Sequence, residues 1–362
     1  MGKGRFLYQN LITSESMIAV SSLRAGIVTS VLKEGAGSAV LNPSGNYSGA
    51  ADLEYTIEID SIAAGAEVGQ ATFKWSDGGG TWDATGVPTS ALNVLLNNGV
   101  YVNWTTGTGA DFVVGDKWFL KGINMFNAAK MIDLDRDHVY RSAALGAPNT
   151  VTVNLGSPQE VKALVIQDHN FTSAAVLTLE ADAAATFDSG GGAVPEFSEP
   201  VVWNAEKIVH FLSAATTKCY WRLKISDAAN PALYVEIGEL FLGSYLELTR
   251  NYVEGYSEET AFLMAQNRTP YGVGNDRFYN SQLTFNFNFG MMPPADVTSM
   301  KALIAAIASR SAGTFKPFWF NKDSATPNES WLVKIASLPV NQRTRTYYFD
   351  MPLALKEVLR SV

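Results

Sequence analysis

Val151-Thr152-Val153-Asn154-Leu155-Gly156 and, shortly after it, Val161-Lys162-Ala163-Leu164-Val165-Ile166 are two runs rich in β-branched and aliphatic residues. Both are typical of short strands, and the glycine that closes the first run is a turn former. Further runs of this kind follow at 176–181, 219–225 and 234–243, with polar or glycine-rich stretches between them. The spacing predicts a β-sandwich between about residue 124 and residue 243.

A second β-rich region covers residues 44–122. Residues 55–60 alternate between apolar and polar types, and Phe73 and Trp75 fall on one face of the next run. Asn98-Gly99 between two apolar runs predicts a type I′ hairpin. The aromatic residues could form either a sugar-binding platform or a core, and their alternation with polar residues favours a core.

The remaining region, 244–362, combines strands with one helix. Residues 283–289 alternate with period two, and Pro293-Pro294-Ala295-Asp296 is typical of a helix start. The apolar residues between 297 and 307 predict one buried helix face. The expected fold class is therefore mainly β, with a C-terminal α+β domain.

Composition excludes several classes of protein. The 362 residues are 47% hydrophobic and 17% charged, which suits two or three folded domains. A net charge of −8 argues against nucleic-acid binding, which needs clustered cations. The sequence contains no run of 18 apolar residues, so we expect no membrane-spanning segment. It also has no apolar stretch near Met1 that resembles a signal peptide. One cysteine, Cys219, allows no internal disulfide and suits folding in a reducing cytoplasm.

Motifs for catalysis are missing from the sequence. The three histidines form no HExxH pattern, and neither a nucleophile elbow nor a phosphate-binding loop occurs. Acidic residues are scattered rather than paired. We therefore expect a protein that is not an enzyme, with no catalytic residues and no cofactor apart from the calcium alternative that follows.

Asp133, Asp135 and Asp137 alternate along the chain and could offer oxygens to Ca²⁺. The run lacks the glycine and the distal glutamate of an EF-hand loop, and Arg136 lies within it. A polar turn in which aspartates accept local backbone hydrogen bonds is the favoured alternative.

Two further groups of residues are candidate sites. The loop after the second strand holds Asp168, His169, Asn170 and Phe171, which combine polar groups with an aromatic ring as ligand-binding loops do. The C-terminal region is unusually aromatic, and the residues predicted to be partly exposed at a subunit interface of a homo-oligomeric ring are Phe285, Phe287, Phe289, Trp319 and Tyr347.

The 124–243 region resembles discoidin or coagulation-factor C-type domains. The resemblance rests on 152–156 with its Leu-Gly step, on 177–182 and 219–223, and on the closing 236–240 segment. The Asn10-Leu11 start and the Ser21-Ser22 step of the family lie far upstream. This implies a jelly roll formed by 1–43 and 123–243, interrupted by a small β-sandwich module at 44–122 and followed by 244–362.

The inserted module is similar to units of bacteriophage tail and fibre proteins, through 47–49, 71–76 and 98–100, and the 318–320 segment resembles tail-tip or baseplate proteins. This implies a structural component of the virion tail, made in the host cytoplasm and assembled with other tail proteins. The discoidin resemblance implies the alternative of a receptor-recognition protein that binds a host surface glycan. A third alternative is an accessory module of a carbohydrate-active enzyme.

Overall fold

The computed structural model describes residues 2–49, 52–78, 80–146, 148–190, 194–253, 255–268, 274–309, 314–337, 342–345 and 348–360. Strands dominate, and helix α1 (Pro294–Ile307) is the one α-helix within these ranges. This confirms the mainly β fold class. The chain forms two compact units, one of residues 22–128 with 140–144, the other of 1–21, 129–139 and 145–362.

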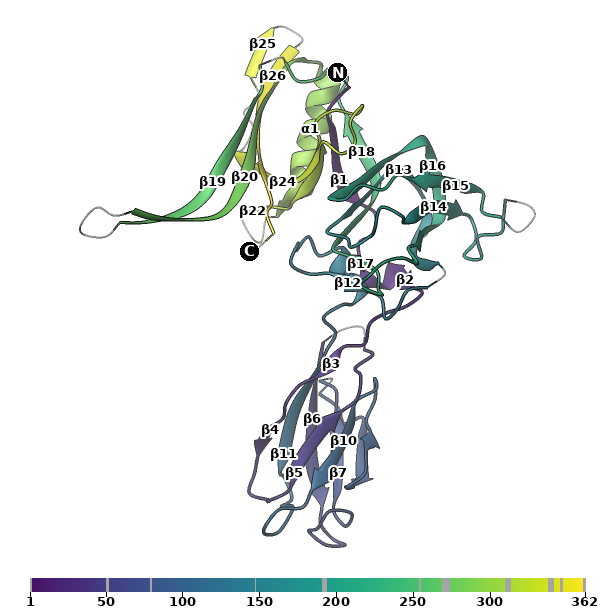
Figure 1. Cartoon of the computed structure of the whole chain (residues 1–362), viewed down its shortest axis with the longest axis vertical. Coiled ribbons are helices and arrows are strands. Elements are labelled where there is room, and N and C mark those ends of the chain that lie inside the picture. Colours follow the sequence, from purple (N-terminus) through teal and green to yellow (C-terminus); the bar gives the residue numbers. More distant parts are fainter. Residues whose placement is uncertain are drawn as a thin grey trace. The chain divides into compact units, whose positions relative to one another are not determined.

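The smaller unit consists of two antiparallel sheets (Figure 1). Its strands are β3 (Ile27–Val28), β4 (Leu32–Glu34), β5 (Val40–Ser44), β6 (Leu53–Ser61), β7 (Thr72–Ser76), β8 (Ala84–Pro88), β9 (Val94–Leu95), β10 (Tyr101–Thr105) and β11 (Lys117–Ile123), and the two-residue strand β12 (Tyr140–Arg141) also belongs to it. One sheet has the order β3-β11-β6-β7-β8, with β4 also on β11, and the other has the order β5-β10-β9.

Aromatic side chains fill the space between these two sheets. The ring of Trp104 lies 4.8 Å from that of Phe73 and 6.2 Å from that of Trp118, and all three are buried. The interpretation of these aromatics as core is confirmed.

The boundary of this unit differs from the one expected. Residues 22–43 were assigned to the jelly roll, but β3 and β4 pair with β11, and β5 pairs with β10 along its whole length. These short strands satisfy backbone groups of β11 and β10 that would otherwise lie on open sheet edges. Strands of two or three residues carry too little periodicity to reveal this in the sequence.

The jelly roll is built around two long strands that change partners midway. Its elements are β2 (Ile18–Val20), β13 (Asn149–Gln167), β14 (Val176–Asp182), β15 (Phe197–Val201), β16 (Lys207–Ser226), β17 (Glu236–Ile237) and β18 (Glu239–Glu247), with the 3-10 turns η1 (Glu15–Met17) and η2 (Ala128–Met131) nearby in the chain. The first half of β13 pairs with β2 and the second half of β16, and the second half of β13 pairs with β18 and the first half of β16.

Both layers of the resulting sandwich contribute to one interior. A void of only about 10 Å³ is bordered by Val151 and Trp221 from the first layer and by Leu164 and Leu242 from the second. The two layers therefore pack face to face at close to full density.

The C-terminal region extends the same sheet instead of forming a separate one. β1 (Arg5–Asn10) pairs with β18 on one side and with β23 (Phe318–Asn321) on the other. From β23 the sheet continues through β24 (Ser330–Ser337), β26 (Tyr348–Glu357), β20 (Gly274–Met292) and β19 (Ser257–Arg268), while β25 (Gln342–Arg345) pairs with β26 and β21 (Ala308–Ser309) pairs with β22 (Thr314–Phe315).

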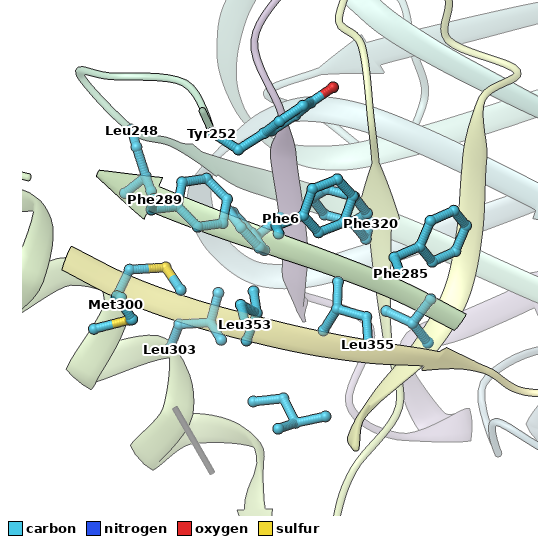
Figure 2. Packing of buried hydrophobic residues seen from close by; sticks show 14 of the residues in the cluster. Phe6, Leu248, Tyr252, Phe285, Phe289, Met300, Leu303, Phe320, Leu353 and Leu355 are labelled. Carbon is cyan, nitrogen blue, oxygen red and sulfur yellow. The ribbon is translucent and has the colours of Figure 1, made fainter. Parts of the chain in front are cut away.

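Helix α1 and strand β1 complete the core of this region (Figure 2). Phe6 of β1 packs with Phe285 and Phe320 from the C-terminal strands and with Met300 and Leu303 from the helix. The N-terminal strand is thus part of the C-terminal core.

The prediction that aromatic residues of this region form an exposed subunit interface is wrong for four of the five. Phe285, Phe287 and Phe289 are at most 2% exposed, and Trp319 is 2% exposed against Leu7 and Phe241. β1 and α1, which the sequence did not place on these strands together, supply the surface that covers them. Tyr347 lies outside the described residues.

Candidate functional site

The loop that follows β13 is held by internal contacts at every residue predicted to bind a ligand. Asp168 has a φ of 54° and forms a two-point ion pair with Arg136, at 2.9 Å to Nε and 3.0 Å to Nη2. Both side chains are largely buried, at 11% and 15% exposed. Both oxygens of the Asp168 carboxylate are therefore paired within the protein.

The other three residues of this loop are equally occupied. His169 Nε2 lies 3.0 Å from the carbonyl of Asn204, and its Nδ1 accepts the backbone N–H of Phe171. Burial lowers the pKa of His169, against the opposing contact with Asn204. Asn170 donates to the carbonyl of Tyr234 and accepts from the N–H of Glu236.

Phe171 is buried and stacks on His169, with ring centroids 4.5 Å apart. Its carbonyl accepts from the indole N–H of Trp203. The structure brings the four predicted residues together, and their polar groups hydrogen-bond to other loops of the jelly roll. These contacts hold the loops in place.

The aspartate run at 133–137 forms a sequence of tight turns. Asp133 accepts the N–H of Asp135, which in turn accepts the N–H of Asp137. His138 Nδ1 lies 2.6 Å from Asp133 Oδ2. The described residues contain no group of three or more His, Cys, Asp or Glu side chains that could hold a metal ion. The alternative of a polar turn accounts for these contacts, and the three carboxylates do not converge on a calcium site.

An open cleft of about 440 Å³ lies where β16 of the jelly roll meets the turn between β23 and β24. Its apolar wall consists of Val202, Val209, Phe211 and Pro327, and its polar lining consists of His210, Ser324 and Asn328. The cleft thus combines a hydrophobic surface with a few polar groups, which is the usual make-up of a small-molecule site.

A carboxylate orients the histidine of this cleft. His210 Nε2 lies 3.0 Å from Glu199 Oε2, and Ser213 donates its backbone N–H and its hydroxyl to the same carboxylate. Burial alone would raise the pKa of Glu199, but the contacts with Ser213 and His210 outweigh it and the pKa is lowered. Glu199 is therefore an anion that fixes the imidazole ring in place.

Phe211 is equally fixed. The guanidinium of Arg5 lies 4.3 Å from the Phe211 ring centroid and 4.2 Å from that of Tyr245, and it donates to Glu247 at 2.9 Å. The two rings meet edge to face at 5.4 Å. This stack supports the aromatic wall of the cleft from behind.

The opposite wall is held by one buried amide. Asn321 is fully buried, and its Nδ2 lies 3.1 Å from the carbonyl of Thr326 and 3.1 Å from that of Glu329. Asn328 sits at the exposed top of this turn. The hydrogen bonds of Asn321 therefore hold the turn that carries the exposed side chain of Asn328.

Sequence reasoning missed this cleft. His210 and Phe211 lie in a β-rich run at 207–212, and Asn328 lies in a polar turn, but nothing in the sequence links the two. The available signal was local, namely a histidine next to an aromatic within a strand.

No protein-family model matches the chain, and no curated protein sequence matches it. Among the described residues, no helix has the length and apolarity needed to cross a membrane.

Several solved structures are similar to about a third of the chain. One is a labelled mutant of chitosan-binding module 1 from a chitosanase/glucanase of Paenibacillus sp. IK-5, with 21% identity, a TM-score of 0.26, and coverage of 33% of this chain and 86% of the module. Another is a fucose-binding module of Streptococcus pneumoniae, with 13% identity, a TM-score of 0.24, and coverage of 32% and 80%. A third is the lectin domain of lectinolysin complexed with Lewis B antigen, with 14% identity, a TM-score of 0.26, and coverage of 33% and 85%.

Proposed function

We propose that this chain is a non-enzymatic binding protein that takes a carbohydrate in the cleft between β16 and the β23–β24 turn. The observation that carries the proposal is that an aromatic residue held in place, Phe211, lines the same cleft as two polar residues, His210 and Asn328. A pyranose ring offers C–H groups on its faces and hydroxyls around its edge. The apolar wall suits the C–H faces of the ring, and the polar lining suits the hydroxyls around its edge.

Rigidity supports this assignment. Glu199 holds His210, Arg5 supports Phe211, and Asn321 organises the turn that presents Asn328. A preorganised cleft loses little conformational entropy when a sugar binds, which matters for a ligand with few strong contacts. The volume of about 440 Å³ lies within the usual range for small-molecule pockets.

Titration of host-derived oligosaccharides, followed by saturation-transfer NMR or calorimetry, tests the proposal. Asn328→Ala is expected to weaken binding about three- to tenfold, the effect of one net hydrogen bond. His210→Ala should weaken it at least as much. Asn288→Ala is the matched control because Asn288 lies exposed on β20, away from the cleft.

Two outcomes contradict the assignment. One is the absence of binding by the wild-type chain to any member of a broad glycan panel at millimolar concentration. The other is binding that survives both cleft substitutions unchanged. Release of reducing ends from bacterial polysaccharides by the pure chain would overturn the non-enzymatic part of the proposal.

We also propose a structural role in a bacteriophage tail, favoured by the hairpin of β19 and β20. β20 pairs with β26 only from Thr284 onward, whereas its pairing with β19 extends back to Gly274 (Figure 1). β19 forms one end of the strand order, and Phe262 on it is 63% exposed. A strand that pairs on one side only, among the described residues, suits strand addition by another tail protein or by a second copy in a ring.

Sedimentation velocity of the full chain tests the assembly role. Phe262→Glu is expected to shift any oligomer towards monomer, because a buried interface charge is costly. Leu92→Glu, at a residue 79% exposed in the smaller unit, is the matched control. An oligomer that Phe262→Glu leaves intact would remove the hairpin from this role.

A further inference from the structure

A second cavity, of about 190 Å³, lies between strands β1 and β18 and the segment that runs from the end of α1 to β23. Its wall includes the aromatic side chains of Tyr8, Phe241 and Trp319, together with Glu239 and Lys316. It shares no residue with the cleft at His210. Besides Glu239, the polar residues Asn10 and Lys316 line this cavity, and most of the other lining residues are apolar.

Glu239 is buried with half of its hydrogen-bonding capacity unused. The residue is 2% exposed, and its Oε1 has no hydrogen-bond partner among the described residues. The carboxyl accepts the backbone N–H of Leu134, whose φ of 59° is unusual for a branched residue. A buried acceptor without a partner costs stability, so its retention in a cavity wall points to a ligand that donates to it.

The charges around Glu239 are predominantly negative. Burial raises its pKa to about 9, and Asp133, Asp168 and Asp135 add to the effect. The cations nearby are already engaged, since Arg136 pairs with Asp168 and Lys130 contacts Asp133. Lys316, an exposed residue of the cavity wall, forms no ion pair among the described residues.

We propose that this cavity binds a small molecule through a primary ammonium group, which pairs with the carboxylate of Glu239 against the aromatic wall. Such a group supplies the hydrogen-bond donor that Oε1 lacks and the positive charge that the surrounding aspartates favour. Aromatic faces also attract ammonium groups, more strongly when the site is desolvated. An anionic ligand would meet the carboxyl group and its acidic neighbours, and a purely apolar ligand would leave Oε1 unpaired.

Binding in this form releases a proton. At neutral pH the free carboxyl holds its proton, and the incoming ammonium displaces that proton to solvent as the carboxylate–ammonium pair forms. The apparent affinity should therefore rise about tenfold for each pH unit between roughly pH 6 and pH 9. A site that holds only neutral hydroxyl compounds would show no such dependence.

The experiment uses the full chain and methylammonium chloride as the probe, with methanol as the neutral probe of similar size. Saturation-transfer NMR of the methyl signal measures binding across this pH range, and calorimetry in buffers of different ionisation enthalpy measures proton release. We expect millimolar binding of methylammonium that strengthens with pH, release of about one proton per bound amine near neutral pH, and no binding of methanol.

Two substitutions localise the effect. Glu239→Gln keeps the shape of the neutral acid, so the variant should fold, and it should lose at least tenfold in affinity. Ala306→Phe places a ring at an exposed position of the cavity wall and should block entry. Glu259→Gln, exposed on β19, is the control.

The proposal is overturned if methylammonium fails to bind at tens of millimolar, if binding is independent of pH, or if Glu239→Gln binds as well as the wild type. The first outcome would mean that the cavity holds no amine, and the other two would mean that the amine binds without the Glu239 carboxylate. Because the cavity and the cleft at His210 share no residue, these outcomes leave the carbohydrate proposal untouched.

Discussion

The rings of Phe6 and Phe320 lie 5.1 Å apart, so the sixth residue of the chain packs inside the core of its C-terminal region. Phe6 is fully buried and also lies 5.8 Å from Phe289. Strand β1, which carries Phe6, pairs with β18 of the jelly roll on one side and with β23 of the C-terminal region on the other. The two regions are therefore one cooperative structure, and damage to β1 should be felt in both.

Phe6→Ala is expected to lower the free energy of unfolding by about 3–5 kcal/mol, the usual cost of removing a buried aromatic ring. Urea denaturation followed by tryptophan fluorescence and by far-UV circular dichroism measures it. Leu92→Ala, at a leucine that is 79% exposed, should change the free energy by less than about 0.5 kcal/mol. Equal effects of the two substitutions would show that Phe6 does not support the core.

The smaller unit should be removable along its structural boundary and not along the boundary expected from sequence. Replacing 22–128 by a short Gly/Ser linker should leave a soluble remainder that unfolds cooperatively. Replacing only 44–122 should leave β3 and β4 without β11, their pairing strand, and expose apolar side chains such as Val28. We expect the second deletion to aggregate on size-exclusion chromatography, and equal behaviour of both deletions would contradict the boundary.

The sequence revealed strand positions better than strand partners. The runs at 151–156 and 161–166 were predicted as two strands separated by a turn, but they form one strand, β13, with a register break between Asn154 and Gln159. Glycine and proline mark an interruption of the ladder. Whether the chain reverses or merely bulges there depends on β16, whose paired residues lie about sixty positions away and which no local pattern identifies.

The same limit applies to the functional site. His169 and Asn170 combine residue types that often bind ligands, yet their hydrogen-bonding atoms contact other loops of the jelly roll. His210 and Asn328 meet at one cleft although 118 positions separate them in the sequence. Residue type indicates what a side chain can do, and only the fold decides which other groups it faces.

The stability of the protein should depend on pH through Glu239. Its pKa is raised from 4.5 to about 9, so the unfolded chain releases this proton earlier than the folded one. The contribution of Glu239 to the free energy of unfolding is fully present below the pKa of this carboxyl in the unfolded chain. It is lost as the pH rises towards the pKa in the folded protein. Relative to the wild type, Glu239→Gln should gain about 1.4 kcal/mol per pH unit over roughly pH 5 to pH 8.

Chemical denaturation of both proteins at several pH values in this range checks the prediction. Glu259→Gln, on the exposed edge strand, should run parallel to the wild type. Parallel curves for Glu239→Gln and wild type would show that Glu239 is ionised in the folded protein.

His169 should produce the opposite dependence at lower pH. Burial lowers its pKa from 6.5, so the folded state keeps the ring neutral while the unfolded state takes up a proton. The contribution of His169 to stability is therefore present above about pH 6.5. It is lost as the pH falls below that value. His169→Gln, measured by thermal unfolding between about pH 5 and pH 8, should flatten this part of the profile, and an unchanged slope would assign it to other groups.

Asp168 and Asn328 should separate stability from binding. Asp168→Asn keeps a residue type that tolerates the φ of 54° but removes the charge that pairs with Arg136. Leaving a largely buried guanidinium without its partner should cost about 3 kcal/mol of unfolding free energy. Because Asp168 does not line the cleft, the carbohydrate affinity of the folded variant should stay unchanged. Asn328→Ala should do the reverse, lowering affinity with little change in stability, since Asn328 is exposed. Parallel denaturation and sugar titrations of the two variants measure both quantities. If Asp168→Asn abolished sugar binding while the protein remained folded, the ligand site would belong to the loop at 168–171 and not to the cleft at His210.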